Sequence, residues 1–547
     1  MPVTPAVQIP RWSKRVVTET GGRDPLGLSR VSAMITDYLL SGIITQTSRA
    51  RYYSFYPWCL WQIKLSEQPH TFEQFTRAFR RREAFMAIST LWLDPKSSVV
   101  GYFAVHPRMA RYKQEGEVET NFKVLPSNSM GGYGQYYGGS LDQLGLTETE
   151  GGIDQCAPGR AEELAKAFDQ KAASTLYCKR ECFRENTIPL TVLEKSAEAF
   201  SLDALQSPSS RLERNLLRDL FFAWDKPQPS HADTLRRHTL GLVLDVAARY
   251  NQAGFRPSIS NIDEYLVYPP YYYEVLLPDD KKVIPYTSPA GLEACFGFWK
   301  QFCVHEYVTL ALEHLLTGVL DVIAHEPSGL AVETICEKLC GKAFKSTLGS
   351  VFGDCSKPCN LLENIKITSK PTAADCRNAQ IQFGAKSRQS ERAIINLGTK
   401  GAGTRAAVAV AMLSVLYAKW RNSPNEYSRH VSSKAGSNLW AGTVLPYLDE
   451  WLNPKLTWQS AFQHFIEPLI LQWHDRVMYE KGKLESCWLH TVEGRVVKDQ
   501  DYVPGFRASR HWNCARIMTD LGLLKVDKGG GISVTKEGRR ALSKVSS

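Results

Sequence analysis

The sequence lacks the segments that carry a chain into a membrane or out of the cell. Met1 is followed by a polar, proline-bearing start, and no apolar core of a secretory signal follows it. No run reaches the roughly 18 uninterrupted apolar residues that a membrane span needs. The best run, residues 406–418, is short and leads into Lys419 and Arg421, which is typical of a buried helix. We therefore expect a cytoplasmic protein with no membrane partner.

The sequence also lacks the motifs of several common catalytic sites. His305-Glu306 begins like a zinc-protease helix, but Thr309 stands where the second histidine would have to be. The glycine-rich segment 398–405 precedes an apolar helix and could cradle an anion, yet no Lys-Ser/Thr pair closes it as in a nucleotide-binding loop. No nucleophile elbow and no nuclease-like cluster of carboxylates and lysine is visible. We expect no enzyme activity, no catalytic residue and no cofactor.

Cysteine is present in an odd number, 13, and without a secretory signal these residues are expected to be reduced thiols. A spacing of four residues places two thiols on one face of a helix, which would suit a metal ion but also results from ordinary helix packing. We predict packing thiols and no metal site. Three pairs have this spacing: Cys178/Cys182, Cys336/Cys340 and Cys355/Cys359.

Size and charge allow several domains and favour an anionic partner. A chain of 547 residues exceeds what one hydrophobic core usually organises, so two to four domains are expected. Lysine and arginine number 66 against 56 acidic residues, a formal net charge of +10. That excess favours nucleic acid, although over so long a chain it could also be spread thinly as solvation. Local clusters of basic residues distinguish a nucleic-acid-binding surface from a thinly spread, solvated charge.

The densest basic-aromatic segment is residues 45–58. Arg49 and Arg51 stand beside Tyr52, Tyr53 and other rings, and guanidinium groups bind phosphates while aromatic faces stack on bases. The alternative is that the rings form core and the arginines pair with acids. A predicted helix over 71–91 adds four arginines on one face, which either contact a partner or are simply solvated.

Composition divides the chain into three predicted domains. Residues 1–150 form a basic-aromatic N-terminal domain, which includes an irregular glycine-tyrosine loop at 130–140. Residues 151–450 read as a mostly helical central domain after an acidic linker at 145–159. Residues 451–547 begin with an amphipathic helix over 458–480 that Pro468 should kink.

The last 44 residues give the strongest pattern: a short amphipathic helix, two strands around a glycine tip, and a capped helix. This order, with the letters LGLL and T-x-E-G-R-x-A-L, resembles winged-helix domains. The resemblance implies DNA contact or, alternatively, a protein-binding module. If the module binds DNA, its contacts are expected at the outward residues of the helix and at the wing tip: Arg507, Arg510, His511, Asn513, Arg516 and Lys528.

The fold class that we predict is mainly α and multidomain, with helical N-terminal and central regions and a small C-terminal winged-helix domain of α+β type. The block 26–61, with its letters TSRARYYSFYPW, and the terminal DLGLL resemble accessory subunits of bacterial defence systems of the ABC-three-component and Lamassu type. That resemblance implies a non-catalytic bridging subunit between an SMC-like ATPase and an effector nuclease, acting against plasmid or phage DNA. The alternative is a stand-alone winged-helix transcription regulator that binds DNA.

Overall fold

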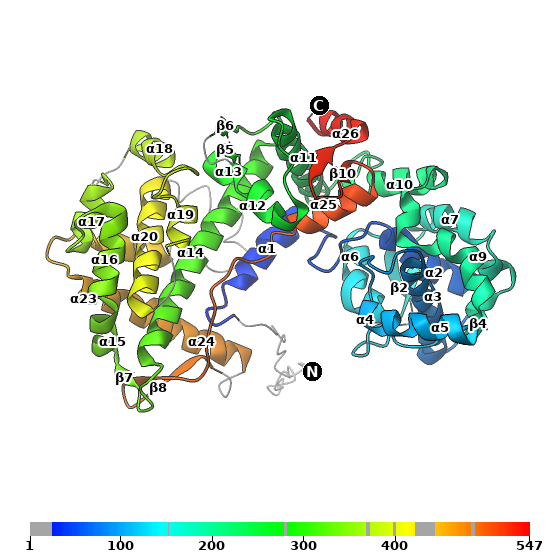
Figure 1. Ribbon diagram of the computed structural model, residues 1–547, viewed down its shortest axis with the longest axis horizontal. Coiled ribbons are helices and arrows are strands. Elements are labelled where there is room, and N and C mark those ends of the chain that lie inside the picture. Colours follow the sequence, from blue (N-terminus) through cyan, green and yellow to red (C-terminus); the bar gives the residue numbers. More distant parts are fainter. Residues whose placement is uncertain are drawn as a thin grey trace, which may run out of the picture. The chain divides into compact units, whose positions relative to one another are not determined.

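The computed structural model describes residues 24–150, 152–277, 282–367, 372–397, 401–421, 443–482 and 487–546. The chain is mainly helical with small sheets, as the sequence predicts (Figure 1). It divides into two compact units, each built from two separate stretches of sequence. Unit 1 comprises residues 1–32 and 304–507, and unit 2 comprises residues 33–303 and 508–547. The predicted limits at 150 and 450 do not coincide with the limits of these units.

Two helices pass from one unit into the other along the chain: α1, Ser29–Leu39, and α14, Glu293–Ile323. The remaining helices of unit 2 are α2 Tyr52–Ser66, α3 Phe72–Leu93, α4 Tyr102–Val105, α5 Met109–Glu115, α6 Gly138–Gln143, α7 Arg160–Ala172, α8 Leu176–Lys179, α9 Leu190–Phe200, α10 Arg211–Phe222, α11 His231–Gln252, α12 Ile262–Val267, α13 Pro269–Tyr272, α25 His511–Asp520 and α26 Lys536–Ser546. Its strands are β1 Glu117–Glu119, β2 Thr147–Glu150, β3 Ile153–Cys156, β4 Thr187–Pro189, β5 Glu274–Leu276, β6 Val283–Pro285, β10 Leu524–Val526 and β11 Ile532–Val534.

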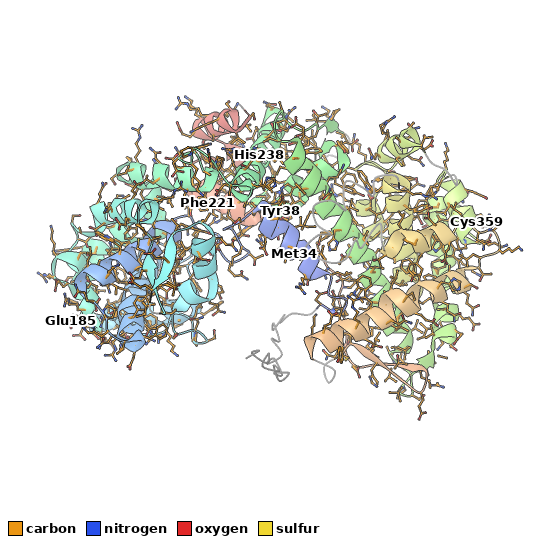
Figure 2. All side chains as sticks on the ribbon, turned by 180° about the vertical axis from the view of Figure 1, so that it is seen from behind. Met34, Tyr38, Glu185, Phe221, His238 and Cys359 are labelled. Carbon is orange, nitrogen blue, oxygen red and sulfur yellow. The ribbon has the colours of Figure 1, made fainter. Side chains whose placement is uncertain are left out.

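The core of unit 2 gathers around α2, whose sequence is apolar on every side, a pattern typical of a fully buried helix. Trp58 of α2 packs on Phe168 of α7 and Phe200 of α9, with ring centroids 5.1 and 5.5 Å apart. Phe221 of α10, labelled in Figure 2, packs edge to face on Tyr53 at 4.9 Å. The aromatic half of the basic-aromatic segment therefore serves as core.

The glycine-tyrosine segment forms a π-helical turn, Tyr133–Tyr137, and not the irregular loop that the sequence predicts. The cause is a buried carboxylate: Glu83 of α3 accepts hydrogen bonds from the Gly132 and Tyr133 amides, at 2.9 and 3.3 Å, and from the Tyr56 hydroxyl. Gly131 allows this approach, because a Cβ there would collide with the Glu83 carboxylate. Burial raises the pKa of Glu83 to about 7.

The C-terminal elements of unit 2 are β10 and β11, an antiparallel hairpin that pairs Leu524 with Val534, and the helices α25 and α26 on either side of it. The hairpin and α26 pack on α11, while α25 packs on both α11 and α12. Residues 257–259 line the outer edge of β11, where the Ile532 amide donates to the Pro257 carbonyl at 2.9 Å. The C-terminal segment is therefore joined to residues far earlier in the chain, and the hydrogen bond between Asn251 and Ile532 spans 281 positions.

Unit 1 is a helical body with one three-stranded sheet. Its helices are α15 Val332–Leu339, α16 Lys342–Phe352, α17 Pro358–Asn364, α18 Ala373–Gln382, α19 Glu391–Ile395, α20 Ala402–Trp420, α22 Leu445–Glu450, α23 Trp458–Ile466 and α24 Gln472–Lys481. Antiparallel strands β7 Leu330–Ala331, β9 Arg495–Lys498 and β8 Leu489–Val492 form the sheet. At the predicted kink, Pro468 lies in a π-helical turn, Glu467–Leu471, between α23 and α24.

Candidate nucleic-acid interface

The helix α25 carries three of the eight predicted DNA contacts, His511, Asn513 and Arg516, and the packing around the helix determines whether they can reach DNA. It begins after Arg510, which adopts a left-handed backbone conformation with φ of 66°. Cys514, Ile517 and Met518 face the core of unit 2, as the amphipathic pattern predicts. The amphipathic pattern also predicts Trp512 on the inner face of the helix, but its side chain is 37% exposed.

Arg510 and Asn513, both predicted to contact DNA, lie in the interior of unit 2. The Arg510 guanidinium pairs with Asp37 at 2.6 Å and donates to the Ile43 carbonyl at 2.9 Å. The Asn513 amide donates to the Thr45 carbonyl at 2.9 Å. Both side chains are less than a tenth exposed. They hold the end of α1 and the segment that follows it against α25, and they are not available to contact DNA.

His511 is also buried, and its environment keeps it neutral. Its ring lies edge to face on Trp299, with centroids 4.4 Å apart, and its Nδ1 is 3.0 Å from the Ser509 hydroxyl. Burial lowers the pKa of His511 to about 4. At neutral pH this side chain therefore brings no positive charge to the surface.

Arg516 is the one helix cation with part of its surface accessible. Burial and the neighbouring Arg49 lower its pKa, and its Nε has no hydrogen-bond partner within the described residues. Its guanidinium carbon lies 5.9 Å from the centre of the Trp512 ring. Arg516 is thus held beside an exposed indole and next to the ion pairs that Arg49 forms with Asp520 and Asp203.

Arg49 and Arg51, the predicted contacts of the N-terminal segment, form buried ion pairs. Arg49 binds Asp520 of α25 at 2.9 Å and Asp203 at 2.6 Å. Arg51, with no exposed surface, binds Glu213 of α10 at 3.1 Å. The two acids raise the pKa of Arg49, against the effect of its burial. These arginines join α2 to α10 and α25, so phosphates cannot reach them in this conformation.

Arg507 belongs to unit 1, where it lies on the polar face of α14. Its side chain pairs with Glu313, and its amide donates to Glu306 at 2.7 Å. Glu306 also accepts from Ser32, and burial raises its pKa to about 7. The neighbouring His305 donates from Nε2 to the Leu28 carbonyl at 3.1 Å. The segment that resembles a zinc-protease motif is therefore a buried attachment point for residues 28–32 and for Arg507.

Lys528, at the tip of the hairpin, is exposed as expected. Lys528 is one of several exposed cations, since others on β10 and on the outer side of α26 are also exposed. The inner side of α26 is marked by the buried residues Gly538, Ala541 and Val545. Their spacing is the sequence signal by which the outer cations could have been found. The exposed set comprises Lys525, Lys528, Lys536, Arg539, Arg540 and Lys544, the last of which lies over the Trp224 ring.

The hairpin that presents these cations is firmly attached. Asp527 accepts from the amides of Gly529 and Gly531, both at 2.9 Å, and pairs with Arg256 at 3.2 Å. The Asn251 side chain bonds the backbone of β11 twice, at Ile532 and Val534. The tip of the hairpin is therefore held in place. Asp527 already has its hydrogen bonds and its ion pair with Arg256.

The 13 cysteines are all free thiols. Among the described residues, no group of three or more His, Cys, Asp or Glu side chains is placed to hold a metal ion. In the same residues, no helix is both long enough and apolar enough to cross a bilayer. No known protein family, no curated protein and no solved structure matches this chain.

Proposed function

We propose that this protein is a non-catalytic subunit that binds nucleic acid through the exposed cations of the β10–β11 hairpin and α26. The observation that carries the proposal is the cluster of six exposed cations on the hairpin and α26, of which Arg540 pairs with Glu537 at 2.7 Å. Within residues 508–547 there are eight Lys or Arg and three Asp or Glu, and Asp520 and Asp527 are occupied in ion pairs. Such a patch favours phosphates through counterion release and not through base-specific contacts.

We further propose that the winged-helix arrangement is larger than the C-terminal segment. Along the chain, α11, residues 257–259, α12, α25, β10 and β11 follow the helix, strand, helix, helix, hairpin order of that fold. In this interpretation α25 takes the place of the recognition helix. Since Arg510, His511 and Asn513 are buried, the module would contact DNA with its wing and not with α25.

The partners of the proposed complex follow from the resemblance to defence-system subunits: an SMC-like ATPase and an effector nuclease. The division into two compact units supports a bridging role, because each unit has its own core to which a partner can bind. The alternative, a stand-alone regulator, needs a helix that enters the major groove. The burial of the polar face of α25 makes that alternative the weaker one.

The DNA proposal is tested by reversing charge at the wing. We expect Lys525→Glu/Lys528→Glu to weaken binding of duplex DNA at least about tenfold at low salt and to reduce the salt dependence of binding by about two phosphate contacts. Fluorescence anisotropy across a salt series measures both. The matched control is Lys342→Glu/Lys345→Glu, the same change in charge at exposed lysines of α16. Equal losses in both variants would show a non-specific charge effect and contradict the proposal.

The bridging role has a separate test. Co-purification from the native operon should recover an ATPase and a nuclease with this chain, and the wing variant should still recover them because its lysines face DNA in the proposal. A chain that purifies alone and binds one specific DNA site would favour the regulator. A chain that binds neither protein nor DNA would refute both functions.

A further inference from the structure

A cavity of about 530 Å³ opens in unit 2, within the size range of small-ligand sites. It brings together two segments that stand out in the sequence, the basic-aromatic segment and the glycine-tyrosine segment, and adds the residues around α4. The lining comprises Gln46, Ser48, Arg49, Tyr52, Tyr136 and Tyr137, with the segments 98–104 and 124–126.

The walls of this cavity are held in place by hydrogen bonds and ring contacts. The Tyr52 hydroxyl accepts from the Val100 amide at 3.0 Å, and the rings of Tyr52 and Tyr137 lie 4.7 Å apart. Arg49 donates to the Ser98 carbonyl at 3.3 Å, and its amide donates to the Tyr137 hydroxyl at 3.4 Å. The cavity is therefore formed before any ligand arrives, which lowers the entropic cost of binding.

The rim carries the most exposed large apolar side chain in the described part of unit 2. Phe103 of α4 is 91% exposed, although the ring would gain free energy from burial. Tyr102 next to it is partly exposed and stacks on His106 at 4.9 Å. A phenylalanine so exposed at the mouth of an aromatic cavity offers a stacking surface to a flat ligand.

The charge and polarity of the side chains that line the cavity indicate which class of ligand it can bind. Arg49 is the charged residue of the lining, and its charge is already engaged by Asp203 and Asp520. The cavity thus suits an uncharged ring better than a phosphate. Gln46 and Ser48 supply an amide and a hydroxyl at one side, groups that hydrogen-bond the edges of bases. Exposed Lys96 and Lys123, close in sequence to the lining segments, add positive charge for a phosphate backbone.

We propose that this cavity binds an unpaired nucleobase of a single-stranded nucleic acid, stacked on Phe103. The proposal rests on the nucleic-acid function proposed above and adds a second contact of a different kind. The wing would bind the phosphates of a duplex, whereas the cavity would bind a base that has left the stack, as at a strand end or in a melted region.

The test uses a short single-stranded oligonucleotide with one 2-aminopurine, whose fluorescence changes when the base stacks on an aromatic ring. The wild-type chain should bind it and change its fluorescence, and Phe103→Ala should weaken binding about tenfold. The matched control is Phe72→Ala, which removes a ring that is 52% exposed, in the same unit and outside the cavity. A second variant, Ala104→Trp, fills the cavity and should abolish the fluorescence change.

Binding of duplex DNA distinguishes this proposal from the one on which it rests. Phe103→Ala should leave duplex binding, and its loss on charge reversal at the wing, unchanged. If duplex binding depends on the wing charges but Phe103→Ala and wild type bind the single strand equally well, the cavity proposal alone is refuted. Absence of both duplex and single-strand binding in the wild type would refute both. Loss of a protein partner in Phe103→Ala, with single-strand binding intact, would assign the cavity to a protein side chain and also refute the proposal.

Discussion

Arginine side chains show how the same residue type serves opposite purposes in this protein. Arg51 and Arg510 turn inward to Glu213 and Asp37, whereas Arg539 stays at the surface. A charge is buried only with an opposite charge and hydrogen bonds, because desolvation otherwise costs several kcal/mol. The inward arginines therefore connect elements, and only the outward ones are available to an anionic partner.

Removal of the Arg51 side chain tests this structural role. Arg51→Ala leaves Glu213 buried without its cation, so we expect a loss of about 3–5 kcal/mol in the free energy of unfolding. The control is Arg77→Ala, whose partner Glu73 and own side chain are largely exposed, and which should cost less than about 1 kcal/mol. Urea denaturation measures both. If Arg51→Ala left the stability unchanged but weakened DNA binding, the result would show that Arg51 contributes to DNA binding and not to stability.

Several helices and strands begin and end where local sequence signals, such as helix caps and turn residues, predict. The sequence predicts a helix over 71–91, and in the structure Thr71 caps α3, which begins at Phe72, by accepting a hydrogen bond from the Gln74 amide. The hairpin β10–β11 forms around its glycine tip as predicted, and a π-helical turn lies at Pro468, where the sequence predicts a kink. The exception is the turn Tyr133–Tyr137, which requires the distant carboxylate of Glu83.

The packing of α26 on the hairpin depends on one glycine. In Gly538→Ala the new Cβ would collide with the Leu523 carbonyl oxygen and lie 2.9 Å from Val534 Cγ1. We therefore expect lower stability, although alanine favours a helix by about 1 kcal/mol over glycine. The control is Gly349→Ala in α16, where nothing lies within 4 Å of the new Cβ and stability should rise. Thermal unfolding compares them, and a stabilising Gly538→Ala would contradict the described packing.

At the scale of the whole molecule, the chain returns to unit 2 after passing through unit 1. Residues 508–547 complete a body that begins at residue 33, so the C-terminal segment is not a separate terminal domain. Its buried contacts explain this dependence: Asp520 binds Arg49 and the Ala50 amide, and Gly241 of α11 lies against Val545. The C-terminal elements and α11 share one core.

Truncation tests this dependence. We expect the isolated fragment 504–547 to remain unfolded, because its apolar face has lost α11 and α12. We also expect a chain that ends at residue 507 to exchange amide hydrogens faster in α11 than the intact chain does. Circular dichroism of the fragment and hydrogen exchange of the truncated chain measure the two effects. A fragment that unfolds cooperatively would show that the segment is an autonomous domain.

The sequence by itself determined the helical class, several of the longer helices, the terminal hairpin and the irregularity at Pro468, since periodicity, caps and turn residues act over a few positions. The burial of α2 could also have been predicted, because its sequence is apolar on every side. Only the tertiary structure decided which arginines face inward. Arg49 meets Asp520 across 471 positions of sequence, and no local pattern specifies so distant a partner. The same long-range packing buries Arg510, His511 and Asn513 and forms the cavity lined by Tyr52 and Tyr137.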